Sequence, residues 1–176
     1  SMKTTDYIAY TVDRLPKGYV FTYDDFYNGV NNKEAIIKAL NRMAVSGKIE
    51  KLSKGKYYKA EKTIFGNLEP PQKQIVKDLL EDNGKIIGYL TGLSIYNQLG
   101  FTTQVSNTIQ IGKNEVRPQL ERGRYFISFV KQKNTITKEK IYAMQLLDVL
   151  RVIDKIPDTT IENTLKRFIE LLKKME

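Results

Sequence analysis

Residues 32–59 read NKEAIIKALNRMAVSGKIEKLSKGKYYK, and this stretch decides the predicted fold of the N-terminal part of the chain. Its apolar side chains recur at the spacing of one helix face: Ile36, Ala39, Leu40 and Met43. This spacing predicts a helix over about 32–46 that ends at Gly47. Turn residues at 53–55 then separate two short strand-like runs, so the sequence predicts a hairpin over 48–59.

Three shorter elements are predicted upstream of this helix. Residues 3–14 have the apolar spacing of a helix, and GYVF at 18–21 is typical of a brief strand. Thr22 is placed as the N-cap of a second short helix, YDDFY, whose acidic first turn suits the helix dipole. The order helix, strand, helix, helix, hairpin is that of a winged helix-turn-helix, in which the third helix enters the major groove of DNA.

The composition excludes several classes of protein. The chain has 176 residues, a net charge of +9 and enough apolar residues for a core, but no apolar run near the ~18 residues that span a bilayer. It has no Cys and no His, which removes disulfides, Cys/His zinc sites and His-based catalysis. We expect no enzymatic activity, catalytic residue, metal site or cofactor and no membrane partner. With no secretory signal visible, the expected location is cytoplasmic.

The positive charge is concentrated in the predicted helix and hairpin. Residues 28–59 contain eight basic and two acidic side chains, a net charge of 8 − 2 = +6, and the other 144 residues share +3. Clustered basic side chains neutralise nucleic-acid phosphates, so double-stranded operator DNA is the expected partner. Solvated lysines are also ordinary on helices and hairpins, and winged helices also bind proteins, which leaves that alternative open.

Within the helix, the side chains opposite the apolar face would meet DNA. Asn41 can pair with adenine and Arg42 with guanine, so these two are the predicted base readers, whereas Lys33 and Lys38 are expected on phosphates. An ion pair from Arg42 to Asp24 or Asp25 is the alternative for that residue. The full set of expected DNA-binding residues is Thr22, Asn32, Lys33, Lys38, Asn41, Arg42, Lys51, Ser53, Lys54 and Lys56.

The composition changes at Pro70-Pro71, which predicts a domain junction. We expect an α+β chain with a winged helix-turn-helix over 1–62, a linker over 63–70 and a mixed α/β domain over 71–176. The elements expected in the second domain, in chain order, are a helix over 71–83, a strand near 86–90, a helix begun by Thr91, strands at 105–112, near Val116 and at 124–132, and a helix begun by Thr137.

A last helix is predicted from Asp158 to about Lys174. Its apolar stripe consists of Ile161, Leu165, Phe168, Ile169 and Leu172. Such a stripe is typical of a helix that packs on a core, which is the favoured interpretation, and a helix that binds a partner is the alternative. The spacing alone does not separate these two interpretations.

Four local motifs in 18–58 support a family resemblance. They are G-x-V-F-T-x-x-D-F from Gly18, A-L-x-R-M from Ala39, G-x-I-x-x-L from Gly47 and K-G-x-Y-Y from Lys54. With GYLTGLSIYNQLGF at 88–101, they make the chain resemble the AbiEi-like antitoxins of type IV toxin-antitoxin systems. Together the motifs cover about 75 residues directly, and those of the N-terminal half are shared in part by other winged helices.

The resemblance implies a cytoplasmic bacterial protein with two roles. Its N-terminal domain would bind operator DNA and repress its own operon, and its C-terminal domain would oppose a nucleotidyltransferase-like toxin encoded beside it. Two alternatives stay open: a ligand-responsive winged-helix regulator with no toxin, and a nuclease that uses carboxylates alone. A homodimer is a further expectation, because two-fold operators match two-fold proteins.

Overall fold

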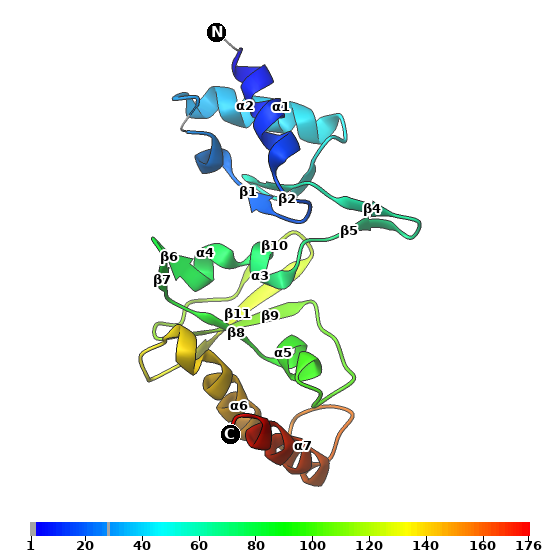
Figure 1. The fold of residues 1–176 in the computed structure, drawn as a ribbon, viewed down its shortest axis with the longest axis vertical. Helices are drawn as coiled ribbons and strands as arrows, with labels where there is room; N and C mark the ends of the chain where they lie inside the picture. The colour runs from blue at the N-terminus through cyan, green and yellow to red at the C-terminus, as the bar shows by residue number, and fades with distance from the viewer. Residues whose placement is uncertain (1–2, 28) are drawn as a thin grey trace. The chain divides into compact units, whose positions relative to one another are not determined.

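The computed structural model describes residues 3–27 and 29–176, which form helices and several small sheets (Figure 1). The predicted α+β class is confirmed. The chain divides into two compact units, unit 1 up to Val76 and unit 2 from Lys77 onward. The predicted boundary lay earlier, at 63–70, and most of that expected linker belongs to a hairpin, β4–β5, in which Thr63 pairs with Gly66.

Unit 1 has the predicted order of elements as far as the hairpin. The elements are α1 (Thr4–Arg14), β1 (Val20–Phe21), η1 (Tyr23–Phe26), α2 (Lys33–Val45), β2 (Glu50–Ser53), β3 (Lys56–Tyr58), β4 (Glu61–Thr63), β5 (Gly66–Leu68) and α3 (Gln72–Ile75). The helix predicted over 32–46 is α2, and the hairpin predicted over 48–59 is β2–β3. Strand β1 joins this hairpin in an antiparallel sheet with the order β1-β3-β2.

The second short helix differs from its prediction. It is a single 3-10 turn, η1, because few residues separate the cap at Thr22 from the next close approach of the chain at Gly29. A Cβ atom at Gly29 would lie 1.9 Å from the ring of Tyr7, so the backbone passes directly against α1 at this point. The segment therefore has room for one tight turn only.

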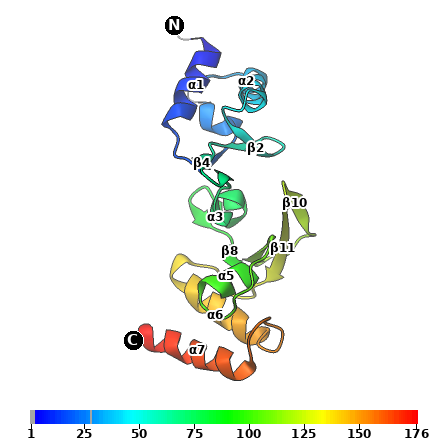
Figure 2. The ribbon, with the colours of Figure 1, turned by 90° about the vertical axis from the view of Figure 1, so that its right-hand side faces the viewer.

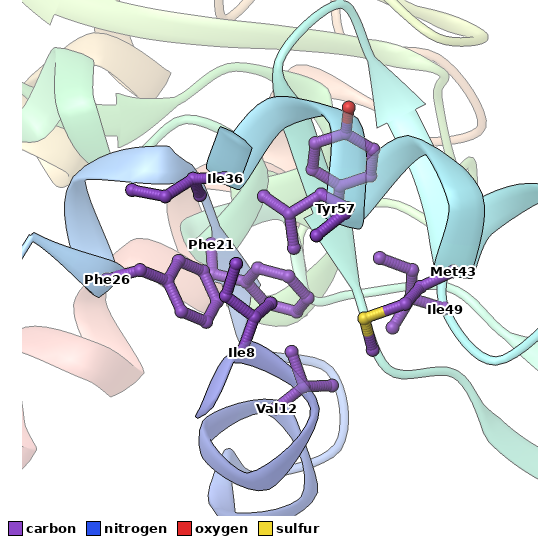
Figure 3. Close-up of a cluster of buried hydrophobic side chains, with 10 residues drawn as sticks. Ile8, Val12, Phe21, Phe26, Ile36, Met43, Ile49 and Tyr57 are labelled. Atoms are coloured by element: carbon purple, nitrogen blue, oxygen red, sulfur yellow. The ribbon is translucent and has the colours of Figure 1, made fainter. Parts of the chain in front are cut away.

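Unit 1 is held by an apolar core between α1, η1, α2 and the three-stranded sheet (Figure 3). The ring of Phe21 is at its centre, edge-on to Phe26 with centroids 5.9 Å apart and stacked on Tyr57 at 6.2 Å. Fully buried Ile8 and Ile36 complete the contact of α1 with α2. Each buried side chain of this size contributes about 1.5–3 kcal/mol of transfer free energy to folding, so this core can stabilise unit 1.

Unit 2 is built on a four-stranded sheet with the order β10-β11-β9-β8. Strands β9 and β11 are parallel, and the other two pairs are antiparallel. Its elements are α4 (Lys77–Leu80), β6 (Glu81–Asp82), β7 (Lys85–Ile86), β8 (Tyr89–Thr91), α5 (Leu93–Gln98), β9 (Thr108–Lys113), β10 (Leu120–Arg122), β11 (Tyr125–Lys131), η2 (Lys138–Lys140), α6 (Ile141–Arg151) and α7 (Ile161–Lys174).

Several predicted boundaries in this part of the chain are wrong. The helix expected over 71–83 is two short helices, α3 and α4, separated by Val76, whose φ of −118° and ψ of 15° are not helical. Thr91 lies in β8 and caps no helix, because its hydroxyl donates to a buried carboxylate instead. Thr137 makes no side-chain cap either, and the strand expected near Val116 begins at Leu120.

Helices α5, α6 and α7 share one core (Figures 1 and 2). Helix α7 starts at Ile161, after a Thr160 cap, and contributes Leu171 and part of Phe168 to this core. Four other members of its predicted stripe are 42–51% exposed: Ile161, Leu165, Ile169 and Leu172. Within the predicted stripe, α7 therefore packs on unit 2 mainly through Phe168, while these four side chains stay about half exposed. Within the described residues, no helix combines the length and the apolar character that crossing a membrane requires.

Candidate nucleic-acid interface

Helix α2 separates its side chains into a buried and an exposed face. Ile36, Ala39, Leu40 and Met43 are buried in unit 1, as the spacing predicted. The exposed side chains include Lys38, Asn41 and Arg42. Three of the expected DNA-binding residues thus lie on the solvent side of one helix, where a ligand could reach them.

Two expected site residues are helix caps. The hydroxyl oxygen of Thr22 accepts a hydrogen bond from the backbone of Asp24 at 3.2 Å, and the side chain of Asp25 accepts from the backbone of Thr22 at 2.9 Å. Asn32 Oδ1 accepts from the backbone of Ala35 at 3.1 Å at the start of α2. Both side chains satisfy N–H groups at the start of a helical turn, so their first role is structural.

Asn41 connects α2 to the hairpin. Its Oδ1 accepts a hydrogen bond from the hydroxyl of Tyr57, whose ring lies in the core while the hydroxyl points out of it (Figure 3). Burial raises the pKa of Tyr57, which keeps this hydroxyl protonated as a donor. Asn41 was predicted as a base reader, but reading adenine uses the amide oxygen and nitrogen together. With the oxygen engaged by Tyr57, the amide of Asn41 ties the helix to the hairpin.

Arg42 is next to this contact and is exposed. Among the described residues, it forms no ion pair with Asp24 or Asp25, so the alternative proposed for it from the sequence is wrong. Asp25 instead accepts from the hydroxyl of Tyr19 at 3.2 Å, besides its bond to the backbone of Thr22. The guanidinium therefore keeps its five donors for another partner.

The eight basic side chains of 28–59 fall into two groups. Three have partners within unit 1: Lys33 lies 4.5 Å from the ring centre of Tyr23, Lys48 pairs with Asp13 at 3.5 Å, and Lys59 donates to backbone carbonyls of residues 13 and 15. Lys56 is half-buried and also takes part in an interaction, and Ser53 next to the turn is half-buried.

The remaining group is named here the basic surface and consists of Lys38, Arg42, Lys51 and Lys54. All four are exposed, and none has an ion pair or a side-chain hydrogen bond with another described residue. The hairpin part and the α2 part of the basic surface are linked through Tyr57. Lys51 pairs with Tyr57 across the hairpin, and the Tyr57 hydroxyl donates to Asn41 on α2.

Unit 2 contains a buried polar cluster that the sequence did not reveal. Asp148 of α6 is 4% exposed, and its Oδ2 accepts from the hydroxyls of Tyr89 at 2.7 Å and Thr91 at 2.8 Å. Gln132 donates to the Tyr89 oxygen at 3.1 Å, and Arg151 lies 3.6 Å from Asp148 Oδ1. Burial, and then the bond to Asp148, raise the pKa of Tyr89 well above its ordinary value. The only signal in the sequence is one acidic residue inside the apolar run of a helix.

This cluster is a hydrogen-bond network that joins the sheet to α6. One atom in it, Asp148 Oδ1, has the Arg151 ion pair but no hydrogen bond. Within 3–27 and 29–176, no three acidic side chains gather closely enough to hold a metal ion.

Comparison with known proteins places the chain in a family. The profile of DUF6088, a family of unknown function, matches residues 7–176, so the chain belongs to this family over nearly its whole length. No curated protein and no solved structure matches the chain.

Proposed function

We propose that unit 1 is a winged helix-turn-helix that binds double-stranded DNA, with α2 in the major groove and the β2–β3 hairpin as the wing along the backbone. The observation that carries this proposal is the basic surface, four exposed cations on two elements with no anionic partner in the described chain. A charged side chain left unpaired on a surface can neutralise a phosphate and release its counterions.

The two elements have different tasks in this proposal. Lys51 and Lys54 of the hairpin, with Lys38 of α2, bind phosphates and give affinity without sequence preference. Arg42 is the predicted base reader, because a guanidinium donates two hydrogen bonds to guanine in the major groove. The Asn41–Tyr57 hydrogen bond fixes the angle between the helix and the hairpin, so both can contact one duplex.

The test is a fluorescence-anisotropy titration of the full chain with two labelled duplexes over a range of salt concentrations. One duplex has the sequence upstream of the gene for this chain, and the other is a mixed sequence of the same length. If each protomer contacts about four phosphates, the log-log salt slope should be near −4. Replacing Lys51 and Lys54 together with Ala should make the slope shallower by about 2 on both duplexes.

Lys62 provides the matched control. It is an exposed lysine of unit 1, but it lies in the other hairpin, β4–β5. We expect Lys62→Ala to leave the slope unchanged within the error of the titration. A salt slope near zero for the parent chain would contradict the proposal. So would an equal change of slope for Lys62→Ala and for the double substitution of Lys51 and Lys54.

The resemblance to AbiEi-like antitoxins extends this proposal to an autorepressor whose unit 2 opposes a nucleotidyltransferase-like toxin. The supporting features are the motifs in 18–58 and 88–101. An adjacent gene for a nucleotidyltransferase, and relief of its toxicity when the two are expressed together, are the expected results. A ligand-responsive regulator without a toxin is the alternative, and it would show no toxic neighbour.

A further inference from the structure

Helix α7 presents an apolar face that its own unit covers only in part. The α7 stripe, defined as Ile161, Leu165, Ile169 and Leu172, follows the spacing i, i+4, i+8 and i+11 along one side of the helix. All four side chains are 42–51% exposed, whereas Thr164 and Leu171 on the adjacent side are buried. An exposed row of large aliphatic side chains is the usual mark of an interaction surface.

The charges beside the stripe have a definite order. Glu162 lies at its N-terminal end and Lys173 at its C-terminal end, and both are exposed without an ion pair to any described residue. They are 173 − 162 = 11 residues apart, which is close to three full turns, so they share one flank of the helix. The flank is thus acidic at its N-terminal end and basic at its C-terminal end, with the exposed Lys166 between them.

We infer that α7 pairs with α7 of a second copy of this chain, in an antiparallel arrangement about a two-fold axis. In that arrangement Glu162 of each copy lies beside Lys173 of the other, and the two stripes cover each other. A parallel pair would instead place this flank of the two copies on opposite sides of the contact, so Glu162 would not meet Lys173. One surface therefore carries both halves of a complementary contact, which is what an isologous dimer requires. Opposed helix dipoles favour the same arrangement.

The size of the contact sets its strength. A helix of 14 residues is about 21 Å long, and one pair of such helices buries less area than a stable interface of ~800 Å² per partner. We expect a reversible dimer with a dissociation constant on the order of 10–100 µM. If unit 1 binds DNA as proposed above, the dimer brings two such units to one two-fold operator, but the pairing itself does not depend on DNA.

Sedimentation velocity of the full chain without DNA, from about 5 to 500 µM, tests the pairing. The parent chain should shift from monomer to dimer within this range. Leu165→Glu should abolish the shift, since it places a charge in the centre of the stripe. Circular dichroism checks that helix content is retained. If the parent chain stays monomeric at the highest concentration, the inference is overturned. This includes the case in which the stripe binds a different protein instead.

A charge exchange tests the direction of the pair. Glu162→Lys and Lys173→Glu should each weaken self-association, because each places like charges together, whereas an equal mixture of the two variants should associate more strongly than either alone. Lys174→Glu has the same charge change on the opposite side of α7 and is the matched control. Failure of the mixture to associate overturns the antiparallel pair, whatever the DNA titration of unit 1 shows.

Discussion

The two units differ in where they put their polar side chains. Among the described residues, every buried polar or charged residue lies in unit 2: Thr91, Thr102, Gln132, Asp148 and Thr164. The core of unit 1 is apolar, apart from the Tyr57 hydroxyl at its edge, and its charges are on the surface. The core of unit 1 thus relies on apolar burial, whereas unit 2 adds buried hydrogen bonds to its apolar core.

The largest expected effect is the removal of the buried carboxylate. Asp148→Ala leaves the hydroxyls of Tyr89 and Thr91 without their acceptor and Arg151 without its ion-pair partner. Losing one partner of a buried charged network costs about 3–5 kcal/mol. Urea unfolding followed by amide signals of each unit should show this loss in unit 2.

Asp154→Ala is the control for that substitution, because Asp154 is an exposed acidic residue in the same part of the chain. Asp154→Ala should change the free energy of unfolding of unit 2 by less than ~0.5 kcal/mol. If the two substitutions destabilised unit 2 equally, the contrast between a polar and an apolar core would not hold.

The same cluster predicts a pH dependence that comes from unit 2. The pKa of Tyr89 is raised in the folded state, so above pH ~10 the folded chain holds a proton that the unfolded chain loses. The contribution of Tyr89 to the free energy of unfolding is then fully present below pH ~10. Above that pH it falls by about 1.4 kcal/mol per pH unit. Tyr89→Phe should make the decline shallower between pH 10 and 11, as measured by urea midpoints. An unchanged slope would show that Tyr89 ionises normally.

The sequence predicted unit 1 better than unit 2, and the reason is physical. The elements of unit 1 are adjacent in sequence and amphipathic, so periodicity and turn residues such as Gly47 and Gly55 were sufficient to place α2 and its hairpin. In unit 2, Thr91 was predicted as a helix cap because the pattern cannot show an Asp 57 positions later that binds it. Spacing also showed that α7 is amphipathic, but not which side is covered.

The sequence predicted where the basic side chains of the candidate site lie better than it predicted the contacts that they make. The basic side chains of α2 and the hairpin are where the sequence placed them. Their partners depend on tertiary contacts that periodicity does not encode. Asn41 is held by Tyr57, and Lys59 donates to carbonyls at the end of α1.

A smaller effect is expected at the hydrogen bond between Tyr57, in the core of unit 1, and Asn41 on its surface. Tyr57→Phe removes the hydroxyl that donates to Asn41 and should cost about 1 kcal/mol, since Asn41 is exposed and can bind water instead. A double-mutant cycle with Asn41→Ala should give a coupling of about 1 kcal/mol. A coupling near zero would mean that the bond does not tie α2 to the hairpin.

The smallest effect on stability, and the most informative one for function, is expected at Arg42. It is exposed and has no ion pair with Asp24 or Asp25, so Arg42→Ala should change the free energy of unfolding by less than ~0.5 kcal/mol. If Arg42 reads a base, the substitution should cost about 1–3 kcal/mol on the upstream duplex and far less on the mixed sequence. Lys38, one turn away, keeps the attraction to phosphates, so non-specific binding should persist. Equal losses on both duplexes would assign Arg42 to the phosphates. A lowered melting temperature would instead mean that the guanidinium helps to hold unit 1 together.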